Sequence, residues 1–148
     1  MNTISQMLRT SPRRSIFEVE ALARCISECL ACAQSCTACA DAGLAEPDID
    51  LLRRCIRLNL DCADLCATTA LMLSRQLEPD RELTRRLIEL QAFSCQLCGD
   101  ECERHAERHE HCRLCSQACR RCEEACRALL KTVVPGDERT DDRADRRH

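Results

Sequence analysis

The spacing of cysteine along this chain is that of an α-helix with one face buried in a bundle. The first ladder steps by 4, 3, 4 and 3 residues through Cys25, Cys29, Cys32, Cys36 and Cys39. Steps of three and four residues return a side chain to the same helix face, so the whole set faces one way. We therefore expect a helix that fills its buried stripe with sulfur, where an ordinary bundle has leucine.

A second ladder with the same alternation lies in the last third of the chain. It consists of Cys112, Cys115, Cys119, Cys122 and Cys126. The stripe then continues through Leu129 and Val133. Segments 29–39 and 112–122 also share the pattern C-x2-C-x-Q-x-C-x2-C. The repeat predicts two helices that face the same core.

Two mixed ladders lie between these and hold the remaining cysteines. One reads Leu52, Cys55, Asn59, Cys62, Cys66, Thr69, Leu73, and the other reads Ile88, Gln91, Cys95, Cys98, Cys102, His105, His109. All 16 cysteines therefore fall on four stripes, whereas cysteines kept as neutral filler would have no reason to avoid outward positions. Asn59 either fixes the helix register by hydrogen bonding or lends its amide oxygen to a metal ion.

Glycine and proline separate four long helix-favouring runs. We expect helices at about 15–42, 48–77, 80–107 and 110–133. Asp48 or Asp50 is the expected cap of the second helix and Asp80 of the third, with Gly43 and Gly136 as C-terminal stops. Connections this short make sequential helices antiparallel. The fold class is therefore all-α, an up-down-up-down four-helix bundle with a cysteine-lined core.

The chain accordingly divides into three parts. Residues 1–14 form an N-terminal segment with room for a short helix, residues 15–133 form the bundle, and residues 134–148 form a tail. The tail is dense in charges of both signs and has no apolar periodicity, so we expect it to be disordered.

Composition narrows the function. The net charge is −3 and only 1% of the residues are aromatic, so the chain lacks the basic surface and the stacking rings of a nucleic-acid binder. No stretch has the apolar length of a membrane span, and residues 1–18 lack the apolar run of a signal peptide. We therefore expect a cytoplasmic protein, in which the thiols stay reduced and are available to a ligand.

Copper(I) is the ligand that suits these ladders best. Thiols four residues apart on a helix lie close enough to grip one soft ion with few ligands. Zinc requires a tetrahedron, and straight helices are expected to converge four sulfurs less easily. Each copper(I) ion also replaces one proton, so a filled core stays near neutral, whereas every zinc on four thiolates would bury two negative charges. We expect multiple copper(I) ions per chain, about one per cysteine.

Other classes fit less well. Iron-sulfur proteins hold their clusters on cysteine sets separated by loops, and continuous helical ladders differ from that pattern. A di-iron oxidase of the same fold needs inward Glu-x-x-His motifs, which this sequence lacks. We therefore expect no enzyme, and a zinc or general soft-metal buffer stays the main alternative. The candidate metal ligands are the 16 cysteines together with His105, His109 and Asn59.

The ladders also suggest one open end. His105, His109 and His111 gather where the first and third connections meet, and we expect copper to enter there. We expect a leucine plug at the other end, made of Leu22, Leu71, Leu73, Leu77, Leu83, Leu87, Leu129 and Leu130.

The motifs C-x3-C-x2-C-x3-C-x2-C, C-x3-N-x2-C-x3-C and HEHCRLCSQACRRCEEAC closely resemble those of the bacterial copper storage proteins, over roughly residues 15–133. The resemblance implies a cytosolic protein for copper storage and detoxification. It further implies copper(I) held mainly by thiolates inside each bundle, a few ions contacted by histidine near one end, and a homotetramer.

Overall fold

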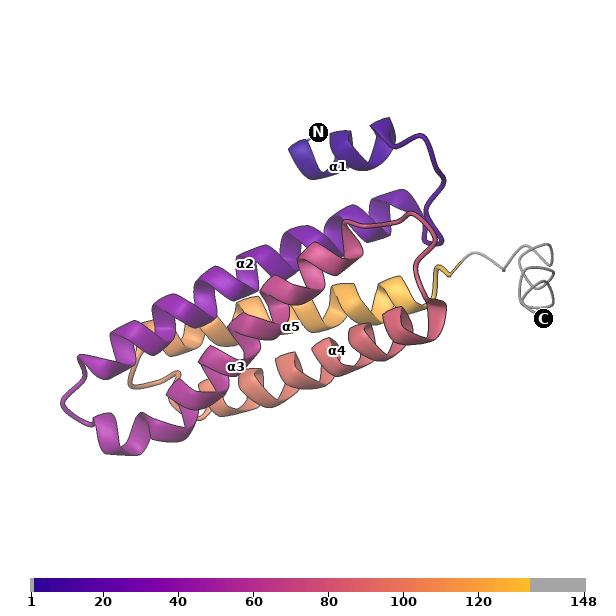
Figure 1. The fold of residues 1–148 in the computed structure, drawn as a ribbon. Coiled ribbons are helices and arrows are strands. Elements are labelled where there is room, and N and C mark those ends of the chain that lie inside the picture. Colours follow the sequence, from indigo (N-terminus) through magenta and orange to yellow (C-terminus); the bar gives the residue numbers. More distant parts are fainter. Residues whose placement is uncertain (1, 134–148) are drawn as a thin grey trace.

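A computed structural model describes residues 2–133 and arranges them as a helical bundle with one additional short helix (Figure 1). The helices are α1 Thr3–Thr10, α2 Val19–Leu44, α3 Ile49–Leu73, α4 Arg81–Glu103 and α5 Glu110–Leu130. No strand occurs within residues 2–133. Among these residues, no helix combines the length and the apolar character needed to cross a membrane. The expected disorder of residues 134–148 and the stop at Gly136 lie outside the described residues.

The four long helices confirm the predicted antiparallel bundle. Helix α2 packs against α3 and α5, and α4 packs against the same two helices, so each long helix has two of the other long helices as neighbours. The connections 45–48 and 104–109 lie at one end of the bundle, which we call the mouth, and the connection 74–80 lies at the other (Figure 1). The cysteine stripes of all four helices therefore meet along one axis.

Helix α1 lies outside the bundle against α2 (Figure 1). Its N-terminus is capped by Asn2, whose side chain accepts a hydrogen bond from the Ser5 amide at 3.0 Å. The first bundle helix begins at Val19 rather than near residue 15, because the Glu18 carboxylate caps its free amide groups.

The other helix boundaries also differ from the sequence expectation. Helix α3 ends at Leu73 instead of about 77, and the Ser74 hydroxyl donates to the Ala70 carbonyl at 2.8 Å there. Helix α4 ends at Glu103 instead of about 107. The chain tightens after it, since the His105 amide donates to the Cys102 carbonyl, three residues back. His105 therefore lies in a turn and not on the helix.

Two of the expected helix signals have different roles. Asp80 does cap α4, with Oδ1 accepting from the Leu83 amide at 2.8 Å. Asp48 occupies the cap position of α3 without a side-chain hydrogen bond to the helix, because its carboxylate bonds to His109 instead. Gly43 lies inside α2 and is not a stop. A Cβ there would meet Ile56 Cγ1 at 3.0 Å, so glycine allows α2 and α3 to approach closely.

The predicted leucine plug is only partly right. Four fully buried residues, one from each helix, close the bundle beyond the sulfurs, and we call them the closing layer: Leu22, Leu73, Ile88 and Leu129. Leu87 and Leu130 are half-buried. The exposed leucines are Leu71, Leu77 and Leu83, and Val133 is also exposed. Leu71 and Leu83 lie off the buried stripes of their helices, and Leu77 and Val133 lie beyond the helix ends.

Candidate metal centre

All 16 cysteines are buried and free, with an exposed fraction of 2% or less. The predicted inward orientation of the four stripes is therefore confirmed. We call the set of 16 sulfurs the sulfur column. It extends from the closing layer to the mouth.

Sulfur atoms face each other across the helix pairs at close range. Between α2 and α5 the Sγ–Sγ pairs are Cys25–Cys126 at 3.6 Å, Cys29–Cys122 at 3.7 Å, Cys32–Cys119 at 3.8 Å, Cys36–Cys115 at 3.7 Å and Cys39–Cys112 at 3.9 Å. Between α3 and α4 the pairs are Cys55–Cys102 at 3.6 Å and Cys62–Cys95 at 3.9 Å. These separations are far longer than a disulfide bond and short enough for two sulfurs to share one ion.

The column also forms compact groups of four sulfurs. Three such groups have all Sγ atoms within 4.8 Å of one another: Cys32, Cys66, Cys95 and Cys122; Cys32, Cys36, Cys62 and Cys119; and Cys36, Cys98, Cys115 and Cys119. The expectation that straight helices converge four sulfurs poorly is therefore wrong, because each group draws on three or four helices. Cys32, Cys36 and Cys119 each belong to two groups, so neighbouring groups overlap.

Burial favours the protonated thiol throughout the empty column, whereas contacts between sulfurs raise the pKa of some cysteines and lower that of others, such as Cys62. The pKa of Cys36 is raised by hydrogen bonding with Cys115 and Cys119 and by burial. The pKa of Cys112 is raised to about 12: the contact with Cys39 lowers it, but hydrogen bonding with Cys55, burial and repulsion between the sulfur charges outweigh that effect. A ligand that displaces these protons must supply positive charge in their place.

Asn59 lies fully buried inside the column. Its Oδ1 atom accepts hydrogen bonds from the Sγ atoms of Cys98, Cys102 and Cys115 at 3.1, 3.2 and 3.3 Å. Its Nδ2 atom donates to Cys55 Sγ at 3.7 Å. The amide oxygen therefore lies among three sulfurs from two helices, which is compatible with either role that the sequence left open.

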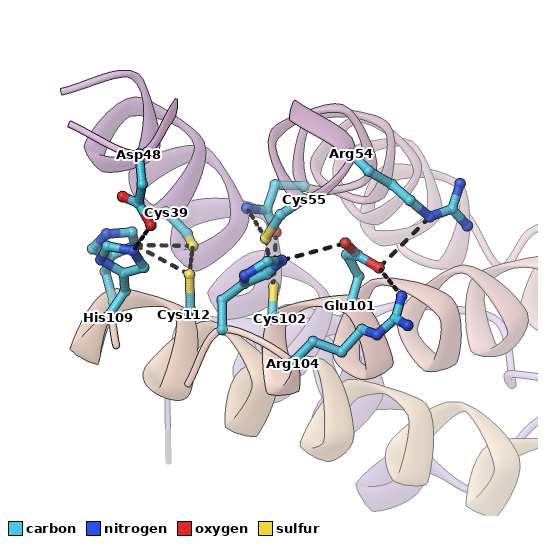
Figure 2. A network of polar contacts seen from close by, with 12 residues as sticks. Cys39, Asp48, Arg54, Cys55, Glu101, Cys102, Arg104, His109 and Cys112 are labelled. Atoms are coloured by element: carbon cyan, nitrogen blue, oxygen red, sulfur yellow. Dashed lines mark hydrogen bonds and ion pairs between the residues drawn. The ribbon is translucent and has the colours of Figure 1, made fainter. Parts of the chain in front are cut away.

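The histidines at the mouth each contact a carboxylate, and Figure 2 labels the pair of His109 and Asp48. Nε2 of His105 lies 3.4 Å from Glu101, Nε2 of His109 lies 3.0 Å from Asp48, and Nε2 of His111 lies 3.1 Å from Glu46. Such pairs are typical of histidines that orient toward a metal. The sequence alone did not reveal these carboxylates, although Glu101 precedes His105 by one helical turn.

His111 is the histidine that the structure places against sulfur. Its Nδ1 atom lies 3.3 Å from Cys39 Sγ and 3.6 Å from Cys112 Sγ. The cysteine stripe favours His105 as its continuation, and the ligand set predicted from the sequence does not include His111. The signal for His111 was its place directly before the first cysteine of α5.

Electrostatics at the mouth follow from these pairs. The hydrogen bond to Asp48 raises the pKa of His109, and the charges of Asp48 and Glu46 add to this effect against the opposing effect of desolvation. The same hydrogen bond holds the pKa of the Asp48 carboxyl below its ordinary value. Glu101, 9% exposed, also pairs with Arg54 at 3.6 Å and Arg104 at 3.4 Å (Figure 2). The mouth therefore carries two clusters of paired charges, one around Glu101 and one around Glu46 and Asp48.

Two solved structures similar to this chain are copper storage proteins. The copper storage protein Ccsp from Streptomyces lividans, loaded with 10 copper equivalents, is 52% identical and superposes with a TM-score of 0.86, over 88% of this chain and 99% of that one. The Cu(I)-bound copper storage protein BsCsp3 is 34% identical with a TM-score of 0.64, over 72% of this chain and 94% of that one.

Sequence comparisons agree with the structural ones. An uncharacterized cysteine-rich protein of Bacillus subtilis, YhjQ, is 35% identical over 94 residues, which are 64% of this chain and 82% of the relative. Residues 18–131, which include the whole sulfur column, match the model of one family, described as copper storage protein. The chain therefore belongs to the copper storage protein family.

Proposed function

We propose that this protein stores many copper(I) ions at once on the thiolates of its sulfur column and thereby also limits copper toxicity. The observation that carries the proposal is the overlap of four-sulfur groups along the bundle axis. A sulfur shared by two groups can bridge two ions, so the column can hold a continuous chain of ions instead of isolated sites. The proposed ligands are the 16 cysteines, His105, His109 and Asn59, with His111 added from its contact with Cys39.

Charge favours copper(I) over zinc in this core. The four-sulfur groups have enough sulfurs for tetrahedral zinc, so geometry alone does not separate the two ions. A zinc ion on four thiolates leaves two negative charges in a fully buried interior, and several such sites would repel one another. Copper(I) replaces protons one for one and leaves the filled column near neutral.

The cytoplasm is the compartment we propose for this protein. Free thiols on the whole column require a reducing environment. The cytosolic copper storage protein from Streptomyces lividans is 57% identical over 76% of this chain, which supports the same location. Because the column offers buried ligands and no exposed reacting group, we propose storage without catalysis.

A homotetramer is the proposed assembly. Support comes from large apolar side chains on the outer faces of the bundle, among them Leu30, Leu60, Leu71, Leu90 and Phe93. Burial of such side chains between copies of the chain would stabilise an assembly. Light scattering of the purified protein, with and without copper, measures the number of chains directly.

Anaerobic titration of the reduced protein with copper(I), followed by metal analysis, tests the storage function. We expect uptake of about one ion per cysteine, and release to a strong copper(I) chelator. Saturation at about four tightly held ions would instead indicate isolated four-sulfur sites and contradict storage. A parallel titration with zinc provides the comparison, and visible absorption of the isolated protein would reveal an iron-sulfur cluster.

A further inference from the structure

Two polar residues interrupt the sulfur column at its closed end. Thr69 on α3 and Gln91 on α4 are both fully buried. Thr69 follows Cys66 by three residues, and Gln91 precedes Cys95 by four, so each lies one stripe position beyond the last sulfur of its helix. The two residues therefore stand between the sulfurs of α3 and α4 and the closing layer.

On the other two helices the column continues at this level. Cys25 lies three residues after Leu22 of the closing layer, and Cys126 lies three residues before Leu129. Their Sγ atoms are 3.6 Å apart. The last level of the column is thus sulfur on the α2 and α5 side, and hydroxyl and amide on the α3 and α4 side.

The Gln91 amide turns its oxygen toward Thr69 and its nitrogen toward sulfur. The Thr69 hydroxyl donates to Gln91 Oε1 at 3.0 Å, which leaves both amide hydrogens for other acceptors. Nε2 of Gln91 lies 3.0 Å from Cys66 Sγ and 3.2 Å from Cys95 Sγ. A rotated amide would turn its oxygen toward these sulfurs, and a thiolate repels that oxygen, so charge on sulfur favours the observed direction together with the Thr69 hydrogen bond. In that direction Thr69 holds the amide oxygen, and the two donors of Gln91 point at the last sulfurs of α3 and α4.

Donation from an amide matters most when the sulfur is charged. Copper(I) binding converts a thiol to a thiolate, and a hydrogen bond to an anion is stronger than one to a neutral group. No further sulfur of α3 or α4 follows Cys66 and Cys95 toward the closing layer, so no ion bound on that side can supply more positive charge. The two amide hydrogens of Gln91 lie on this side of Cys66 and Cys95, where a further ion would otherwise lie. Asn59, by contrast, presents its oxygen to three of its four sulfur neighbours.

We propose that Gln91, aimed by Thr69, is a positioning residue that caps the sulfur column and strengthens copper(I) binding at Cys66 and Cys95. The proposal rests on the storage function proposed above. At the closed end of the column, hydrogen bonds from Gln91 would stabilise the thiolate charges that a further ion would otherwise neutralise.

Anaerobic competition with a chromogenic copper(I) chelator tests the cap. Gln91→Leu keeps the side-chain volume, and we expect its copper capacity to be unchanged. Its affinity for the ions on Cys66 and Cys95 should be lower by about tenfold or more, so these ions should transfer to the chelator more readily. Gln91→Glu replaces a donor with an acceptor oxygen and should lower the affinity for these ions further. Thr69→Val keeps the shape of the core, removes the aiming hydroxyl, and should give an intermediate loss.

Ile88→Val is the matched control, because it alters packing in the closing layer without removing a donor to sulfur. Its competition curve should match that of the wild type. A merely structural Gln91 would change the unfolding of the metal-free protein and leave the copper affinity of the folded protein as it is. Competition curves of Gln91→Leu and Thr69→Val that coincide with wild type would overturn the cap. A wild-type capacity of only about four ions would instead contradict the storage function itself.

Discussion

The Nδ1 atom of His111 lies 3.3 Å from the Sγ atom of Cys39, so an imidazole ring meets the sulfur column at its open end. The Nε2 atom of the same ring is held by Glu46 at 3.1 Å. A ring held at one nitrogen presents the other in a fixed direction. An ion that arrives at the mouth therefore finds one nitrogen and two sulfurs already close together.

We expect His111→Ala to slow the transfer of copper(I) from a weak chelator to the reduced protein, with total capacity reduced by no more than about one ion. Stopped-flow absorbance under anaerobic conditions measures the rate. The His105→Ala/His109→Ala double variant should also slow transfer, but less, because the hydrogen-bond partners of these rings are carboxylates. A wild-type rate in His111→Ala, with slow transfer in the double variant, would show that the sulfur contact has no part in uptake.

Asn59→Leu should reduce capacity by about one ion per chain, since it removes an oxygen that contacts three sulfurs while all 16 thiols remain. The metal-free variant should stay folded, because leucine is of similar volume and thiols are weak hydrogen-bond donors. Metal analysis after desalting gives the count, and circular dichroism checks the fold. An unchanged count would assign Asn59 to helix register alone.

Copper(I) loading should release about one proton per ion at neutral pH. The reason is that many thiolate charges buried side by side would repel one another. The pKa of most thiols is therefore raised, as at Cys36 and, to about 12, at Cys112, although contacts between sulfurs lower the pKa of others, such as Cys62. Each bound ion then displaces a proton, so the apparent copper affinity should rise as pH increases. A pH-stat titration in weak buffer measures the protons. Release of far fewer protons than ions would mean that the empty column already holds thiolates.

Leu73→Ala should lower the free energy of unfolding of the reduced, metal-free protein by about 2–5 kcal/mol, because Leu73 is fully buried in the closing layer. Leu71→Ala, two residues away but 62% exposed, should change it by about 0.5 kcal/mol or less. Denaturant unfolding followed by circular dichroism compares the two. Equal losses would contradict the placement of the closing layer on the buried stripe.

The bundle and its core were predictable because one local period governs both. Steps of three and four residues define a helix face whatever surrounds the helix, and 16 cysteines on such steps leave a single way to bury them. The same motifs resemble those of the copper storage proteins, and that resemblance also predicts a four-helix bundle. The exposed Leu71 and Leu83 show that the number of leucines near a bundle end does not predict which of them are buried, since a leucine there is buried only when it lies on the stripe.

The chemistry of the mouth was less predictable because it depends on contacts between distant segments. Asp48 and His109 are 61 residues apart, and Glu46 and His111 are 65 apart, so no local pattern pairs them. The sequence predicts His105 on a helix, but that helix ends two residues earlier, at Glu103. The contact of Asp48 with His109 also explains why Asp48, a favoured N-cap residue type, gives α3 no side-chain cap.

The group Cys32, Cys66, Cys95 and Cys122 takes one sulfur from each of the four long helices. An ion bound there ties together segments that must separate before a protease can cleave the chain. Since a ligand that binds only the folded state reduces the population of opened states, each added ion should lengthen the life of the molecule that carries it. Empty chains would then be degraded before full ones, and the metal itself would set how long its container persists.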